Sequence, residues 1–280
     1  MMKSYNLTSA TNSYLSFFWE ILRLYFRRLS ELNPKKRAAQ LFSLDNDKIG
    51  RNISVTGFYE LTNLRLMKSI LFKEKEQSGI AIDIGANIGN HTLYFSHIFD
   101  KVFAIEPHPA LFKVLEANTI WNNASNVRCL NVAFGKDRSY TLLAQEQQSH
   151  SGTFRINSTK AHGIKIEIRK GDEVMHEVKE SIKLIKIDVE GFESDVLAGL
   201  EQTISSHRPI IWFEAENAEK AKTSIQFLRS LGYSDFKIPW NASVRKGSLK
   251  RYLLFPINRC KLVPLQSILN HHYSCILAIP

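Results

Sequence analysis

The sequence predicts an α/β fold built on a parallel sheet with crossover helices, and three observations support this prediction. From residue 80 onward, short apolar runs typical of buried strands alternate with segments that have helical periodicity. The first of these runs leads through a glycine turn into a helix, as at the ligand-binding edge of a parallel sheet. With 280 residues, 44% of them hydrophobic, the chain is long enough for one such domain with a full core and appendages.

The expected elements follow one another in a regular order. Residues 49 to 77 carry a short strand-like piece, a turn at Gly57 and an apolar helix. The strands expected after them are residues 80–84, 101–105, 127–133, 181–191 and 208–217, with a closing strand in the C-terminal "YSCILAIP". The helices expected between them are residues 89–98, 109–119, 192–206 and 218–231.

Two segments break this alternation. Residues 144–162, "AQEQQSHSGTFRINSTKAH", are rich in Gln, Ser and Thr and poor in apolar residues, so we expect a mobile loop there, on the side where a substrate would enter. The next segment, "GIKIEIRKG", alternates apolar and charged residues. This pattern predicts a half-exposed strand with Ile164, Ile166 and Ile168 on one face.

The N-terminal part is expected to be a basic extension, residues 1–48, preceding a domain formed by residues 49–280. Residues 1–40 hold seven basic and two acidic residues, and so supply half of the net charge of +10. Within residues 14–37, aromatic and aliphatic residues recur at helical spacing with arginines near the end. Such a stripe more often packs on its own domain, and the alternative is peripheral contact with the inner face of a membrane.

The remaining composition favours a cytoplasmic protein without a metal site. The three cysteines form no CxxC pair, which argues against a disulfide framework and a zinc cluster. Neither a cleavable signal nor a run of 18 uncharged apolar residues is present. A nucleic-acid partner is not expected either, because no known module or pattern of basic residues with stacking aromatics is found.

The glycine turn limits the choice of ligand. In "IAIDIGANIGNHT", residues 80–92, a dinucleotide fingerprint starting at Gly85 would require glycines where Asn87 and Asn90 stand. A phosphate-binding loop would require Lys and then Ser or Thr after the second glycine, and the sequence there is Asn90-His91. Nicotinamide dinucleotides and nucleoside triphosphates are therefore disfavoured.

Two acidic residues point to a different nucleoside. Asp83, at the end of the first strand, suits a cationic ligand better than a pyrophosphate, although it could also serve only to fix the turn. Glu106 ends the second strand, where a carboxylate can accept hydrogen bonds from both hydroxyls of a ribose. A nucleoside that carries a sulfonium and an amino group but no phosphate fits both residues, and S-adenosylmethionine is such a molecule.

Three further carboxylates are expected at the same edge of the sheet. Asp188 and Glu190 follow one buried strand in "IKIDVEGFE", and Glu214 ends the next in "IIWFE". A carboxylate there could accept the proton of a hydroxyl that is being methylated. Acidic residues in a first helical turn could also serve the helix dipole alone. His91, His150 and His162 are further candidate bases, and Lys186 is interpreted as a structural partner of an acidic residue.

Taken in order, the segments "GFYE", "IDIGANIGNHT", "AIEPHP", "NVAFG", "LIKIDVEGFESDVLAGL" and "IIWFEAEN" resemble the FkbM family of S-adenosylmethionine-dependent methyltransferases. The resemblance covers residues 49 to 240. It implies the class I, Rossmann-like methyltransferase fold with seven strands and helices on both faces, and O-methylation of a hydroxylated acceptor, often a sugar or glycan.

The resemblance also implies roles for individual residues. The expected cofactor-binding residues are Asp83, Gly85, Asn87, Gly89, Asn90, Glu106, Ala133 and Asp188. Asp188, Glu190 and Glu214 would lie where the donor methyl group meets the acceptor. The N-terminal helix and the loop at 144–162 lie outside the shared motifs, so the acceptor is the least defined part of this inference.

Two other functions were weighed against this one. An RNA methyltransferase would fit the basic charge, but base methylation usually uses an Asn/Asp-Pro-Pro-Tyr/Phe motif where this chain has Asp188-Val189-Glu190-Gly191. A non-catalytic, nucleoside-binding peripheral membrane protein is the third possibility, although such a protein has no need of the glycine turn together with five acidic residues.

Overall fold

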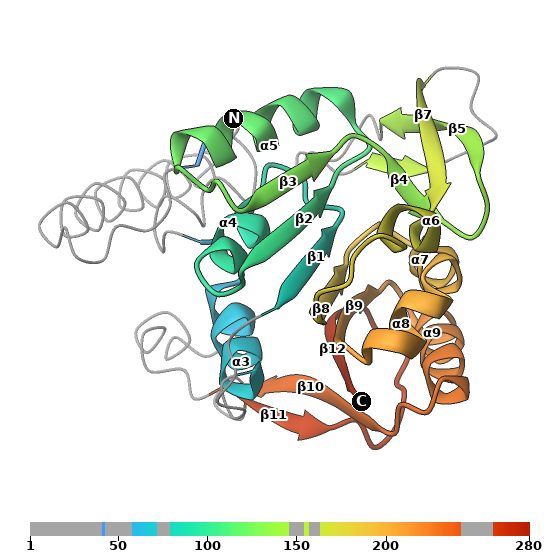
Figure 1. The fold of residues 1–280 in the computed structure, drawn as a ribbon. Helices are drawn as coiled ribbons and strands as arrows, with labels where there is room; N and C mark the ends of the chain where they lie inside the picture. The colour runs from blue at the N-terminus through green and yellow to red at the C-terminus, as the bar shows by residue number, and fades with distance from the viewer. Residues whose placement is uncertain (1–40, 43–57, 72–78, 146–153, 157–162, 242–259) are drawn as a thin grey trace, which may run out of the picture.

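The computed structural model describes residues 41–42, 58–71, 79–145, 154–156, 163–241 and 260–280. Figure 1 shows a central twisted sheet with helices on both of its faces and a small second sheet beside it. The predicted α/β class with a mostly parallel sheet is therefore confirmed. The predicted strand-like piece around Ile53 and Val55, the turn at Gly57 and the extension up to residue 40 lie outside the described residues.

The central sheet has eight strands in the order β11-β10-β12-β9-β8-β1-β2-β3. Their bounds are β1 Ile80–Ile84, β2 Lys101–Ile105, β3 Val127–Leu130, β8 Ile182–Ile187, β9 Ile210–Ala215, β10 Asp235–Asn241, β11 Cys260–Pro264 and β12 Tyr273–Ile279. Strands β3, β2, β1, β8 and β9 are parallel, whereas β12 lies antiparallel between β9 and β10. Seven strands were expected, and the eighth is β11, an edge strand that pairs only with β10 among the described strands.

The parallel strands are buried because helices cover both faces of the sheet. All five residues of β1 are buried, and their side chains point alternately to two different clusters. On one face, α3 Leu61–Leu71 and α4 Asn90–Ser96 pack over Ala81 and Leu184, and α5 Pro109–Trp121 packs over Ala104. On the other face, α7 Glu193–Gly199, α8 Glu201–His207 and α9 Ala218–Ser230 cover the isoleucines of β1, β8 and β9.

The helix expected at 192–206 is divided in two. α7 covers Glu193–Gly199 and α8 covers Glu201–His207, while α9 Ala218–Ser230 agrees with the helix predicted there. At the division, a Cβ on Gly199 would lie 1.9 Å from the carbonyl oxygen of Gly135. The close contact between this helix and the second sheet explains why a glycine stands at that point.

The second sheet has four strands in the order β4-β7-β5-β6 and corrects two predictions. Its strands are β4 Ala133–Gly135, β5 Ser139–Gln145, β6 Phe154–Ile156 and β7 Ile164–Lys170, and the short helix α6 Gly171–Met175 follows them. The third strand was expected to run to residue 133, but it ends at Leu130, and Ala133 begins the second sheet. The expected loop 144–162 contains the end of β5 and all of β6, and its other residues lie outside the described part. β7 has the predicted alternation, since Ile166 and Ile168 are buried.

One short piece of the N-terminal extension is described, and it contacts the domain. The backbone amide of Phe42 donates to Asn118 Oδ1 (2.7 Å), and Asn118 Nδ2 donates back to the Phe42 carbonyl (3.2 Å). The ring of Phe42 lies edge-on to Trp121, with 5.5 Å between centroids. Among the described helices, none has the length and apolar character needed to cross a membrane.

Candidate active site

A cavity of about 530 Å³ opens at the carboxyl ends of the parallel strands. Most of the residues predicted for the site line it, namely Gly85, Asn87, Asn90, Glu106, Ala133, Asp188, Glu190 and Glu214. Asp83 and Gly89 do not line the cavity. The topology explains this gathering, because parallel strands end at one edge and the turns after β1, β2, β8 and β9 meet there.

The glycine turn after β1 requires its glycines. Gly85 has φ +78°, and a Cβ at this position would lie 1.8 Å from the carbonyl oxygen of Asp188. Gly89 precedes α4 with φ +93°, and its Cβ would lie 2.7 Å from Leu115. Between them, Asn87 adopts φ +52° and its side chain accepts a hydrogen bond from the Ile88 amide (2.8 Å). The turn is therefore held in a conformation in which its own backbone forms part of the cavity wall.

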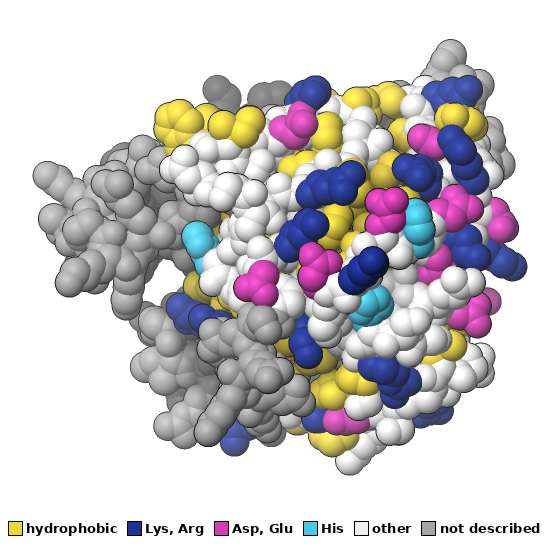
Figure 2. All heavy atoms as spheres, viewed as in Figure 1, with side chains coloured by type: hydrophobic (Ala, Val, Ile, Leu, Met, Phe, Trp, Pro, Cys, Tyr) yellow, Lys and Arg dark blue, Asp and Glu magenta, His cyan; other side chains and the backbone are white. Residues whose placement is uncertain are grey.

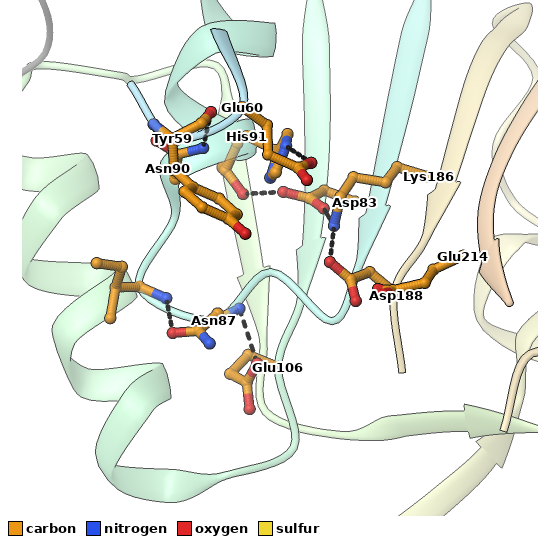
Figure 3. A network of polar contacts seen from close by, with 12 residues as sticks. Tyr59, Glu60, Asp83, Asn87, Asn90, His91, Glu106, Lys186, Asp188 and Glu214 are labelled. Atoms are coloured by element: carbon orange, nitrogen blue, oxygen red, sulfur yellow. Dashed lines mark hydrogen bonds and ion pairs between the residues drawn. The ribbon is translucent and has the colours of Figure 1, made fainter. Parts of the chain in front are cut away.

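Glu106 lies at the end of β2 with its carboxylate held by the backbone. The Asn87 amide donates to one oxygen at 2.8 Å, and the His108 amide donates to the other at 2.9 Å. Burial raises the pKa of Glu106 to about 7, against the opposing effect of these two amides. Figure 3 shows Glu106 beside the glycine turn, where it links the ends of β1 and β2.

Lys186 joins two of the predicted acidic residues. Its Nζ lies 3.2 Å from Asp83 Oδ1 and 3.3 Å from Asp188 Oδ2, which confirms its predicted pairing with acidic residues. Asp83 is completely buried and also accepts a hydrogen bond from the Thr92 hydroxyl (2.7 Å). In this structure the carboxylate of Asp83 is therefore directed to Lys186 and Thr92 and lies behind the cavity wall.

Asp188 and Glu214 form a pair in which the two groups have opposite pKa shifts. Burial opposes ionisation of Asp188, but the Lys186 ammonium and a hydrogen bond with Glu214 prevail and lower its pKa to about 2. Burial, together with the Asp188 carboxylate, raises the pKa of Glu214 to about 10. At neutral pH the pair consists of an ionised Asp188 and a protonated Glu214, as in other paired carboxyl groups that share one proton.

Glu190 follows Asp188 on a strained turn. Its backbone lies in the left-handed region (φ +50°), as do the backbones of Glu60 (φ +54°) and Asn87. Three of the five described non-glycine residues with positive φ thus line the cavity. Backbone strain of this kind is common at functional sites.

Several lining residues were not assigned a role by the sequence analysis. Tyr59 and Glu60 precede α3, and the backbone of Tyr59 is fixed by two hydrogen bonds with the Asn90 side chain (2.8 and 3.1 Å). Burial, with Glu60 and three more carboxylates nearby, raises the pKa of Tyr59, so its hydroxyl keeps its proton. The segment "GFYE" belonged to the family resemblance, which was the only sequence signal for this pair.

Two histidines complete the polar side of the cavity. His91, considered above as a base, is buried, lies edge-on to Trp212 and has its Nε2 3.6 Å from Glu60 Oε2. His272 precedes β12, lines the cavity and contacts Glu214 through its Nε2. His272 is 84 residues from Asp188 in the sequence, so no local pattern connects the two. His150 and His162 lie outside the described residues.

The other half of the cavity is apolar. Leu111, Val132, Ala133, Phe134 and Leu143 line it beyond Glu106. Together with Glu106 and the glycine turn, this half fits a nucleoside with an uncharged base, and so fits S-adenosylmethionine. Within the described residues, no group of three or more His, Cys, Asp or Glu side chains could hold a metal ion.

Comparisons with known proteins agree with this geometry. A model of the methyltransferase FkbM domain matches residues 83–234. "Methyltransferase 1" from Beauveria bassiana is 29% identical over 143 residues, covering 43% of this chain and 57% of that protein. "Hexuronic acid methyltransferase AglP" from Haloferax volcanii is 28% identical over 160 residues, covering 55% of this chain and 64% of that protein. The chain thus spans less than two thirds of the length of either relative.

Among solved structures, the methyltransferase FkbM from Methylobacillus flagellatus KT is similar, with 17% identity and a TM-score of 0.46 over 81% of this chain and 52% of that chain. The domain match covers more than half of the sequence and contains the glycine turn, Glu106 and the Asp188–Glu214 pair. The chain belongs to the FkbM methyltransferase family, which uses S-adenosylmethionine as methyl donor, as the sequence motifs predicted.

Proposed function

We propose that this protein transfers a methyl group from S-adenosylmethionine to a hydroxyl of a sugar, a glycan or a related small molecule. The observation that carries the proposal is the single cavity that joins Glu106 and the glycine turn to the carboxyl groups of Asp188, Glu190 and Glu214. One end of this cavity suits a nucleoside, and the other end suits a hydroxylated molecule without phosphate.

The chain's own residues would hold the donor as follows. Glu106 would accept hydrogen bonds from the ribose hydroxyls, and Ala133 with its apolar neighbours would contact the adenine. The turn formed by Gly85, Asn87 and Asn90 would line the methionine part, close to the Asp188 carboxylate, which attracts an ammonium or sulfonium. When bound, S-adenosylmethionine supplies a methyl group on a sulfonium, which is reactive toward an aligned oxygen.

The charges on the acceptor side support an acceptor without phosphate. Glu60, Asp188, Glu190 and Glu214 line this side, and the one lining ammonium among the described residues, Lys186, is already paired with two carboxylates. Among the described residues on the face shown in Figure 2, Lys and Arg side chains are interspersed with Asp and Glu side chains and form no continuous basic track. Nucleic acids need such a track, and a phosphate would be repelled by the cavity. The hexuronic acid named for one relative supports the sugar class.

Catalysis would depend mainly on alignment. The side chains of Tyr59, Glu190 and His272 line the acceptor end, where they could hydrogen-bond sugar hydroxyls and place one of them behind the methyl carbon. Binding of the donor and the acceptor in the cavity would displace water that could compete for the methyl group. The sequence analysis assigned proton acceptance to one of the carboxylates Asp188, Glu190 and Glu214, and this role stays a prediction.

A transfer assay with methyl-labelled S-adenosylmethionine tests the proposal. The acceptors are methyl glycosides of a neutral hexose, an amino sugar and a hexuronic acid, with a short RNA as the rival acceptor. We expect labelled product with at least one glycoside and none with RNA, and less of this product in Glu106→Gln at a low concentration of S-adenosylmethionine. Methylation of RNA alone, or of no glycoside, would contradict the proposal.

A further inference from the structure

His272 stands at the acceptor end of the cavity in contact with Glu214. It is the residue before β12, and β12 pairs with β9, whose residue Glu214 lies at the same edge of the sheet. The His272 side chain is 55% exposed, whereas the Glu214 side chain is 20% exposed. The imidazole can therefore meet an entering acceptor while one of its nitrogens contacts a carboxyl group inside the cavity.

The neighbouring acidic pair is poorly suited to accept a proton itself. Lys186 neutralises much of the charge of Asp188 and keeps this residue ionised to about pH 2, which makes it a weak base. Glu214 already carries a proton at neutral pH, because its pKa is raised to about 10 by burial and by Asp188. A hydroxyl acceptor must release a proton when it is methylated, and neither member of this pair is suited to accept it.

We propose that His272, positioned by Glu214, accepts the proton of the acceptor hydroxyl. This inference rests on the proposed function and assigns the base for it. A bond forms between the acceptor oxygen and the methyl carbon, while the carbon–sulfur bond of the donor breaks and its electron pair stays on sulfur. The hydroxyl proton passes to Nδ1 of His272, so the positive charge lost from the sulfonium is found on the imidazolium.

Glu214 gives His272 the tautomer that this step needs. If the Glu214 proton is shared with Asp188, its Oε1 is free to accept a hydrogen bond from Nε2–H of the neutral imidazole. Nδ1 is then left as the proton acceptor, in the arrangement by which a carboxyl group orients a histidine base. The imidazolium that forms would face an acidic pair that carries one negative charge.

The other acidic groups that line the cavity also favour the imidazolium form of His272. The groups that line the same cavity are Tyr59 and Glu60 from the segment before α3, His91 from α4, Glu106 after β2, Lys186 and Asp188 on and after β8, Glu190 in the following turn, and Glu214 from β9. The acidic groups among them favour an imidazolium, and the one ammonium is taken up by Asp83 and Asp188.

The first test needs no acceptor. Nitrogen NMR of the full chain labelled in histidine reports the tautomer of each ring, with the His272 signals identified by their loss in His272→Gln. We expect neutral His272 to be mostly in the Nε2–H tautomer, and Glu214→Ala to restore a mixture. His271, the exposed neighbour stacked on Tyr273, is the matched control. A tautomer of His272 that does not respond to Glu214→Ala would overturn the proposal.

The second test uses a glycoside that the native protein methylates. We expect His272→Ala to lower kcat by about 10²–10⁴-fold with little change in the KM for S-adenosylmethionine, and added imidazole to restore part of the loss. His271→Ala should keep its activity. A kcat above one tenth of the native value, or a loss that imidazole does not reverse, would refute the role. If no glycoside is methylated, the proposed function fails and the NMR test alone decides on His272.

Discussion

The electrostatics of the cavity depend on a single residue, Lys186. Its ammonium is buried with only 3% of the side chain exposed, between Asp83 on the neighbouring strand and Asp188 at the end of its own strand. Burial alone would lower the pKa of Lys186, but the two carboxylates raise it, so the charge is retained. Lys186 thus pairs with two acidic side chains, of which Asp188 lies next to a third, Glu214.

Replacing Lys186 should therefore destabilise the fold strongly. Lys186→Met would leave Asp83 and Asp188 close together without a cation, and we expect a loss of about 3–5 kcal/mol in the free energy of unfolding. Lys183 lies on the same strand and is partly exposed, so Lys183→Met is the matched control and should change the free energy of unfolding little. Asp83→Asn combined with Lys186→Met should recover part of the loss. Equal effects of the two lysine substitutions in chemical denaturation would show that the pairing contributes nothing.

The raised pKa of Glu214 predicts a pH dependence of stability. Folded Glu214 keeps its proton up to about pH 10, whereas an ordinary glutamate loses it near pH 4.5, so the contribution of Glu214 to stability falls as pH rises from about 5 to 10. Glu214→Gln cannot ionise and should remove this fall, so the variant should gain stability relative to the native protein as pH rises from 5 to 9. Thermal unfolding of the native protein and of the variant between pH 5 and 9 measures this pH dependence. Glu177→Gln, at an exposed position, is the control. An unchanged pH profile in Glu214→Gln would contradict the protonated state.

Individual site residues could be predicted where a motif surrounds them. Gly85, Glu106 and Asp188 each end a buried strand in a recognisable pattern, and all three line the cavity. His272 could not be predicted, because its role depends on the pairing of β12 with β9, which brings distant segments together. The direction of the Asp83 side chain toward Lys186 also required the sheet register, in which these two residues are paired.

At the scale of single elements, the turn after β1 is the most constrained. A methyl group on Gly85 would overlap the carbonyl of Asp188 and would sit on a backbone with φ +78°. The conformational cost alone is about 1–2 kcal/mol, and the overlap must also push β8 and β1 apart at the cavity.

Gly85→Ala should accordingly lower the free energy of unfolding by at least about 1–2 kcal/mol. It should also abolish measurable binding of S-adenosylmethionine. Ala86→Gly, in the same turn, removes a side chain without creating an overlap and is the control for flexibility. Calorimetric titration and denaturation of both variants give the comparison. Native affinity in Gly85→Ala would show that the turn does not form the binding surface.

The elements differ in how well the sequence predicts them. Strands β1, β2, β8, β9 and β12 are apolar runs buried on both faces, so their composition alone reveals them. β10 and β11 mix lysine and proline with apolar residues, as strands near an open edge do, and carry no such signal. Strand β6 is only three residues long and lies in a polar segment, so it becomes a strand only by pairing with β5.

At the scale of the whole molecule, the basic N-terminal extension bears on where in the cell the domain acts. We propose that residues 14–37 attach the protein to the inner face of a membrane, since they combine aromatic residues with arginines. Phe42, only five residues after the end of this segment, is fixed on α5, so such a contact would hold the domain close to the lipid surface.

Cosedimentation with anionic vesicles tests this attachment on the full chain. Replacing Arg23, Arg27 and Arg28 by Gln should weaken binding roughly a hundredfold, because each basic residue near an anionic surface contributes about 1 kcal/mol. Binding of the native chain should also fall with added salt. Replacement of Lys165, Arg169 and Lys170 on β7 by Gln provides a control with equal charge loss. Equal partitioning of native and N-terminal variants would show that the segment has another role.

We infer that the cavity at the edge of the central sheet is the binding site for S-adenosylmethionine. Calorimetric titration of the full chain with S-adenosylmethionine and, separately, with NAD tests it most directly, with Glu106→Gln and the partly exposed Glu116→Gln on α5 as matched variants. The account predicts saturable binding of the methyl donor only, about ten- to a hundredfold weaker in Glu106→Gln and unchanged in Glu116→Gln. Equal affinity in Glu106→Gln, or a preference for NAD, would contradict it.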